Sequence, residues 1–73
     1  MLPGEMPAYA LVQDEGQRAT VIVYYASESV YIKEHREYDC VQHAVDTLLA
    51  EGCESVLVIW ATGSVEIYTH NIA

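Results

Sequence analysis

The candidate ligands for a transition metal in this sequence are Cys40, His43, Cys53 and His70. Cys40 and His43 stand three residues apart, a spacing that would place both on one face of a helix within reach of one zinc ion. The intervals from this pair to Cys53 and His70 match no zinc-finger or zinc-ribbon pattern. Cysteines also often serve only as packing groups. We therefore predict that the protein holds no metal and no other cofactor.

Cys40 is also the best candidate for a nucleophile, because the pKa of a thiol tends to fall at the start of a helix and His43 lies nearby as a base. The neighbouring acids Glu37 and Asp39 oppose that fall. The four glycines do not cluster into a phosphate-binding loop. No catalytic constellation remains, and we expect a protein that is not an enzyme.

The charge balance is the clearest indication of a partner. The 73 residues carry 11 acids and 3 lysines or arginines, which gives a formal net charge of -8. Such a charge disfavours direct binding to nucleic acid phosphates or to membranes, and it steers a protein toward basic surfaces. We expect the partner to be a larger protein or nucleoprotein complex with a basic surface. A homodimer is a further assembly that the sequence allows.

Length and composition predict one folded domain over residues 1–73, in which residues 1–7 form an irregular lead-in. The hydrophobic content of 52% argues against a disordered acidic tail. The first seven residues resemble no signal peptide, and two cysteines are too few for a disulfide scaffold. We therefore expect a cytoplasmic protein with reduced thiols.

Four segments have the composition of β-strands. Alternating patterns predict strands over residues 18–26, 30–35 and 65–69, and an apolar run predicts a buried, internal strand over residues 55–61. In the first of these segments Val21, Val23 and Tyr25 point to one face, and Thr20, Ile22 and Tyr24 point to the other. Residues 8–13 are the candidate for an additional short strand.

One helix is expected over residues 40–51. Asp39 is the predicted N-cap, Gln42 completes a capping-box pattern, and Gly52 provides the left-handed position that ends many helices. The apolar residues follow helical spacing and form one stripe: Val41, Ala44, Val45, Leu48 and Leu49.

These elements predict an α+β fold, an antiparallel four-stranded sheet with one helix on one face (ββαββ), to which the short N-terminal strand can add. One helix covers only one face of such a sheet. The second face then binds a second copy or a partner, unless the first twelve residues fold back over it.

The size, acidity and layout resemble those of the small inhibitors that phages encode against host defence, the anti-CRISPR proteins. The strand pair 18–26 and 30–35, the helix 39–51 and the closing hairpin 55–69 carry this resemblance. It implies a viral, non-enzymatic inhibitor in the cytoplasm of the host bacterium, which blocks a basic nucleic-acid-binding or recruitment surface of a CRISPR effector complex. The chain is also similar to sheet-plus-helix antitoxins that neutralise a basic toxin. A small homodimeric enzyme or ligand-binding subunit is the third alternative.

The residues expected to contact a partner fall into two sets. The acids lie at turns and element ends: Asp14, Glu15, Glu34, Glu37 and Asp39. Tyrosine is enriched at binding hot spots, and four tyrosines complete the predicted surface: Tyr24, Tyr25, Tyr31 and Tyr68.

Overall fold

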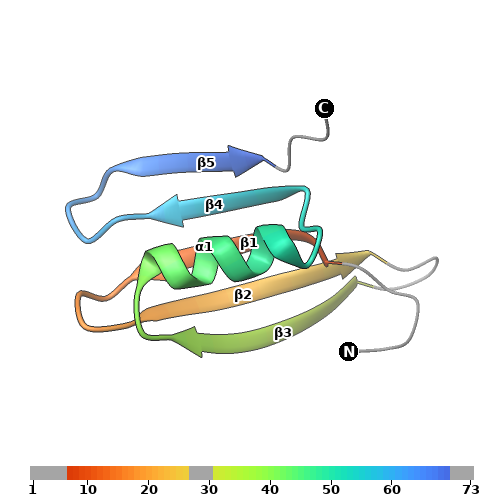
Figure 1. The fold of residues 1–73 in the computed structure, drawn as a ribbon, viewed down its shortest axis with the longest axis horizontal. Helices are drawn as coiled ribbons and strands as arrows, with labels where there is room; N and C mark the ends of the chain where they lie inside the picture. The colour runs from red at the N-terminus through yellow and green to blue at the C-terminus, as the bar shows by residue number, and fades with distance from the viewer. Residues whose placement is uncertain (1–6, 27–30, 70–73) are drawn as a thin grey trace.

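The computed structural model describes residues 7–26 and 31–69, which form one helix packed on one face of a sheet (Figure 1). The predicted α+β class is therefore confirmed. The elements in chain order are β1 (Pro7–Asp14), β2 (Ala19–Ala26), β3 (Tyr31–Tyr38), α1 (Val41–Ala50), β4 (Ser55–Ile59) and β5 (Val65–Thr69).

The sheet differs from the predicted antiparallel four-stranded layout, because it has five strands in the order β3-β2-β1-β4-β5 and is mixed. The additional N-terminal strand exists, and it lies at the centre of the sheet. β1 pairs antiparallel with β2 and parallel with β4. The physical reason is the helical crossover: β3 runs in the direction of β1, and α1 carries the chain back so that β4 starts in that same direction.

The hydrophobic core fills the space between α1 and the sheet. Leu48 of the helix is fully buried against Val12, Val21, Val56 and other side chains of the three central strands. Val21, Val23 and Tyr25 share one face, as their alternation predicts, and the structure shows that this face points into the core. The strand of residues 55–59 is internal, between β1 and β5. Leu49 and Trp60 pack at the margin of the core.

The cap at the start of α1 differs from the prediction. Cys40 is the N-cap, and its Sγ accepts a hydrogen bond from the backbone N–H of His43 at 3.5 Å. Asp39 instead contacts the His43 ring, and Gln42 donates to Asp46 at 2.9 Å, so no capping box forms. The chain turns one residue later than expected because β3 continues to Tyr38.

The end of α1 agrees with the prediction at Gly52. This glycine has a φ of 92°, and its N–H donates to the carbonyl of Leu49 while the N–H of Cys53 donates to the carbonyl of Leu48. These two bonds form a Schellman motif, which a residue with a side chain would strain. The motif turns the chain sharply so that β4 can enter the sheet beside β1.

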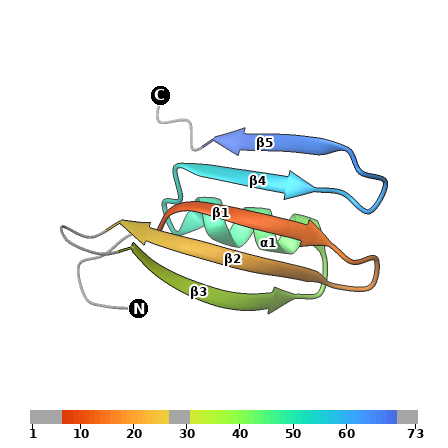
Figure 2. The ribbon, with the colours of Figure 1, turned by 180° about the vertical axis from the view of Figure 1, so that it is seen from behind.

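Among residues 7–26 and 31–69, no helix covers the face of the sheet opposite α1 (Figure 2). The alternative prediction was that the first twelve residues fold back over this face. Residues 7–12 do not do so, because they form most of β1 within the sheet. Pro7, expected in the irregular lead-in, is the first residue of β1. Residues 1–6 lie outside the described ranges, as do residues 27–30, which include the first residue of the strand predicted over residues 30–35.

Candidate partner-binding surface

The sheet surface opposite α1 is called here the open face. Side chains alternate across a strand, so every second residue of each strand lies on this face. The paired residues of neighbouring strands set it out as rows that cross the sheet. Its members are Tyr9, Leu11, Gln13, Thr20, Ile22, Tyr24, Lys33, His35, Glu37, Ser55, Leu57, Ile59, Val65, Ile67 and Thr69.

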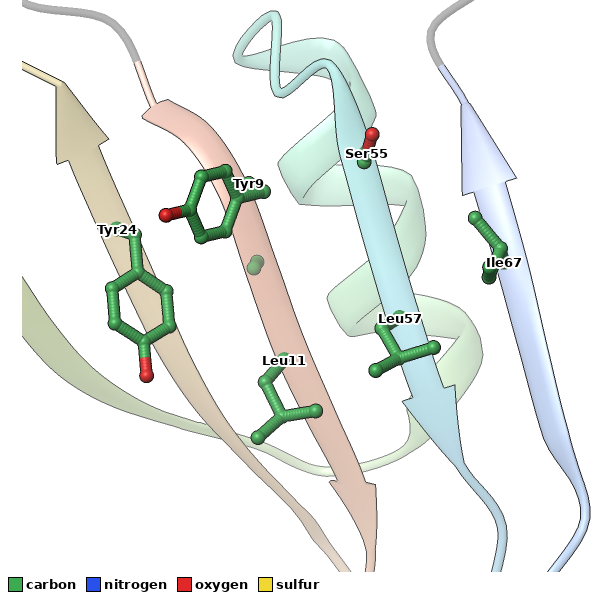
Figure 3. A pocket seen from close by; sticks show the side chains of 7 residues that line it. Tyr9, Leu11, Tyr24, Ser55, Leu57 and Ile67 are labelled. Atoms are coloured by element: carbon green, nitrogen blue, oxygen red, sulfur yellow. The ribbon is translucent and has the colours of Figure 1, made fainter.

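An apolar groove of about 620 Å³ crosses the open face (Figure 3). The strand register brings its walls together, because Leu11 stands opposite Leu57, and Leu57 stands opposite Ile67. The rings of Tyr9 and Tyr24 lie with their centroids 5.1 Å apart at one end. The groove is lined by Tyr9, Ala10, Leu11, Tyr24, Ser55, Leu57 and Ile67.

The apolar side chains of the open face are strongly exposed at several positions. Tyr9 is 45% exposed, Val65 is 57% exposed and Ile67 is 68% exposed. A single exposed hydrophobic residue is ordinary on a protein surface, whereas a contiguous patch marks a binding surface. Here the exposed residues flank a groove whose floor is also apolar, so they form one patch.

Acidic side chains gather at one end of the sheet, where the turn between β1 and β2 lies beside the end of β3. Arg18 Nε lies 3.3 Å from Glu15 Oε1, and Arg18 Nη1 lies 3.7 Å from Glu37 Oε1. Arg18 thus forms ion pairs with two carboxylates, those of Glu15 and Glu37, and all three side chains are exposed. Asp39 follows at the end of β3, where its side chain is 79% exposed. We call Asp14, Glu15, Glu37 and Asp39 the acidic end.

Two of these acids also hold local structure. Asp14 Oδ1 accepts from the N–H of Gly16 at 2.9 Å, and its Oδ2 accepts from the N–H of Ala61 at 3.2 Å. Asp14 therefore joins the β1–β2 turn to the β4–β5 turn. His43 Nδ1 lies 2.7 Å from Asp39 Oδ1, and this hydrogen bond lowers the pKa of Asp39 below its ordinary value.

Glu34 and Tyr25 lie on the helix side of the sheet, in a network around Arg36. The Tyr25 hydroxyl donates to Glu34 Oε1 at 2.7 Å, and Arg36 Nε donates to the same oxygen at 2.8 Å. The Tyr25 bond is the largest cause that lowers the pKa of Glu34, followed by the Arg36 bond. The remaining guanidinium hydrogens reach Tyr25, Tyr38 and both oxygens of Glu51. This network ties β2 and β3 to the end of α1.

The predicted contact residues thus divide between two sides of the molecule. Tyr24 lies in the groove, and Glu37 lies on the open face at the acidic end. Tyr68 lies on the helix side of β5, where its hydroxyl donates to Glu66 at 3.4 Å. The side chain of Tyr31 lies outside the described structure.

Apart from Tyr24, the sequence prediction missed the residues that form the groove. Tyr9 and Leu11 belong to a segment that was expected only as a short additional strand. The sequence placed Leu57 in a strand that is apolar on both faces, and it placed Ile67 in an alternating strand. Neither pattern shows that Leu57 becomes a neighbour of Leu11, because this depends on the parallel pairing of β1 with β4.

Among the described residues, the metal-ligand candidates do not converge on one site. Cys40 is exposed at the start of α1, and Cys53 is buried beyond its end, where burial raises the pKa of the thiol. Its Sγ–H donates to the carbonyl of Ser55 at 3.2 Å. No group of three or more metal-binding side chains occurs among residues 7–26 and 31–69. His70 lies outside these ranges.

Comparison with protein families, with curated proteins and with solved structures finds no match to this chain. Within the described part of the chain, no helix has the length and apolar character needed to cross a membrane.

Proposed function

We propose that this protein is a non-enzymatic binding protein that docks on a larger protein through its open face. The observation that carries the proposal is the exposed apolar groove bounded by Tyr9, Leu11, Leu57 and Ile67. Its dimensions suit the insertion of apolar side chains of a partner. Burial of exposed apolar surface is the main favourable term in protein association, at roughly 25 cal/mol per Å². Tyr9 and Tyr24 add aromatic surface of the kind that is enriched at binding hot spots.

The partner is proposed to present basic groups beside its apolar contact. Glu37 lies on the open face, in the row of residues next to the row that contains Leu11, and Glu15 joins it through Arg18. The formal net charge of -8 gives the whole molecule a field that attracts a basic surface. A basic surface that binds nucleic acid has this chemistry, and an acidic protein bound there would exclude the nucleic acid.

We propose, within this class, an anti-CRISPR protein that acts in the cytoplasm of a host bacterium and occupies a nucleic-acid-binding or recruitment surface of a CRISPR effector complex. This identity depends on the resemblance in size, charge and layout. The alternative within the same mechanism is an antitoxin that covers the basic site of an RNA-cleaving toxin. Both proposals require binding without turnover, and they differ in which purified partner is bound.

The test measures binding to purified CRISPR effector complexes and to purified basic ribonuclease toxins by biolayer interferometry. We expect tight binding to one of them, together with loss of its nucleic acid binding. Leu57→Asp should weaken the complex at least about ten-fold, because it places a charge in the groove. The acid it introduces does not oppose attraction to a basic partner, so the loss reports on the apolar contact.

Charge reversal tests the electrostatic part separately. The double variant Glu15→Lys/Glu37→Lys should lower the association rate at low salt, and the difference should shrink at high salt. The matched control is Asp46→Lys/Glu54→Lys, which makes the same change in net charge at exposed positions outside the open face. Equal effects of the two double variants would contradict a role for the acidic end. Turnover of a small molecule by the protein alone would contradict the binding function.

A further inference from the structure

The two edge strands of the sheet have opposite characters. Residues 33–37 of β3 are all ionisable, and charged side chains along an edge discourage pairing with another chain. β5, over residues 65–69, has one charged residue, no lysine and no proline. Val65 and Ile67 are also strongly exposed. Within the described part of the chain, no strand pairs with the outer side of β5. This edge therefore lacks the usual protection against strand addition.

The turn between β4 and β5 determines which residues of β5 form hydrogen bonds with β4. Trp60 N–H donates to the carbonyl of Ser64 at 2.8 Å, so this pair is the first hydrogen-bonded pair of the hairpin. Bonded and non-bonded pairs alternate in an antiparallel ladder, which makes Glu66 and Tyr68 the residues bonded to β4. The other residues direct their N–H and C=O groups to the outer side: Val65, Ile67 and Thr69.

We propose that β5 pairs antiparallel with β5 of a second copy of this chain, about a two-fold axis at Ile67. In this register Ile67 faces Ile67 of the second copy, and Val65 faces Thr69 of the second copy. All of these residues direct their backbone groups outward, so each pair exchanges hydrogen bonds. Glu66 stands opposite Tyr68 of the second copy, which avoids the facing of like charges.

Two neighbouring registers would use the same outward-facing N–H and C=O groups, but their side chains pair less favourably. An axis at Glu66 would place two Glu66 carboxylates directly opposite in a non-bonded pair, where side chains are closest. An axis at Tyr68 would leave Val65 without a partner in the strand. The complementarity of β5 with itself therefore favours a second copy, with the axis at Ile67, as the occupant of this edge.

The pairing would join two sheets into one, with both helices on the same side. It would also bring the two grooves together, because Ile67 forms a wall of each. The open face of each copy stays available, so this inference does not depend on the proposed function. Each copy carries a net charge of -8, and the copies repel each other through the solvent. Added salt should therefore strengthen the dimer.

Sedimentation equilibrium at concentrations up to about 1 mM tests the dimer directly. We expect a monomer–dimer equilibrium that shifts toward the dimer as salt increases. Two variants of one position test the register: Tyr68→Lys would place opposite charges across the interface, and Tyr68→Glu would place like charges there. Both lose the same tyrosine packing, so each serves as the control of the other. The lysine variant should dimerise at least about ten-fold more tightly than the glutamate variant at low salt.

A chemically synthesised chain with an N-methyl group on Ile67 tests the backbone bonds without changing a side chain. This N–H points outward, so circular dichroism should show a folded protein that no longer dimerises. A monomer at all concentrations would overturn the inference, as would a dimer that persists after N-methylation or an equal affinity of the two Tyr68 variants. Those results would leave the proposed function to be decided by its own binding test.

Discussion

Replacement of Arg36 by methionine should strongly destabilise the protein, because this side chain joins the sheet to the end of α1. The guanidinium donates to Glu34 at 2.8 Å, to Glu51 at 2.8 and 3.0 Å, to Tyr38 at 3.0 Å and to Tyr25 at 2.9 Å. Each of its N–H groups therefore has an acceptor. The bond with Glu51 is the largest cause that raises the pKa of Arg36 above its ordinary value, so the side chain stays charged.

The expected loss follows from the exposure of the network. A hydrogen bond to a charged group contributes about 1.5–3 kcal/mol when buried. The Arg36 side chain is 19% exposed, and those of its partners Glu51 and Glu34 are 32% and 38% exposed, so solvent weakens these bonds. The bonds also share one side chain and are not additive. We expect Arg36→Met to lower the free energy of unfolding by about 2–3 kcal/mol. Domains of this size have only about 4–11 kcal/mol in total.

Urea unfolding followed by the fluorescence of the single tryptophan, Trp60, measures this loss. Arg18→Met is the matched control, because the Arg18 side chain is 58% exposed and its ion pairs should contribute less than about 0.5 kcal/mol. In a double-mutant cycle, Arg36→Met and Glu51→Gln should show a coupling of about 1 kcal/mol or more. A loss no larger than that of the Arg18 variant would refute the role assigned to this network.

Three further predictions concern the core, the response to acid and the thiols. Leu48→Ala should lower the free energy of unfolding by roughly 2–5 kcal/mol in urea titrations, because this side chain is fully buried, and a loss below 1 kcal/mol would contradict its place in the core. The pKa of Glu34 is lower in the folded protein than its ordinary value of 4.5. The ionised Glu34 therefore stabilises the fold above pH 4.5, and this stabilisation is lost as the pH falls through the folded pKa. The free energy of unfolding of Glu34→Gln should depend less on pH in this range than that of the wild type. A thiol reagent at neutral pH should label the exposed Cys40 quickly and the buried Cys53 only on unfolding, and equal labelling rates measured by mass spectrometry would contradict the packing of Cys53.

Local patterns were sufficient to predict the elements around the core. The helical spacing of Val41, Ala44, Val45 and Leu48 fixed the buried side of α1, and Gly52 marked its end. The alternation in β2 placed Val21, Val23 and Tyr25 on one face of the strand, which the structure shows to be the helix side. These predictions succeed because side-chain periodicity within one element decides which face is buried.

The arrangement of the strands depends on contacts between distant segments, and sequence patterns did not predict it. Residues 8–13 gave a signal for a short strand, but nothing in their composition placed β1 between β2 and β4. The groove depends on that placement. The cap was also mispredicted: Asp39 has the better side chain for an N-cap, but Cys40 occupies the position, two residues after the end of β3.

Comparison of three bait proteins in one affinity-capture experiment tests the role of the open face most directly. Wild-type protein and Leu57→Asp are used with a bacterial lysate, bound proteins are quantified by mass spectrometry, and Asp46→Lys is included as a control outside the open face. We predict that wild type and Asp46→Lys enrich the same nucleic-acid-binding complex, and that Leu57→Asp reduces this enrichment at least about ten-fold. Equal enrichment by wild type and Leu57→Asp would contradict the claim that the open face is the binding surface.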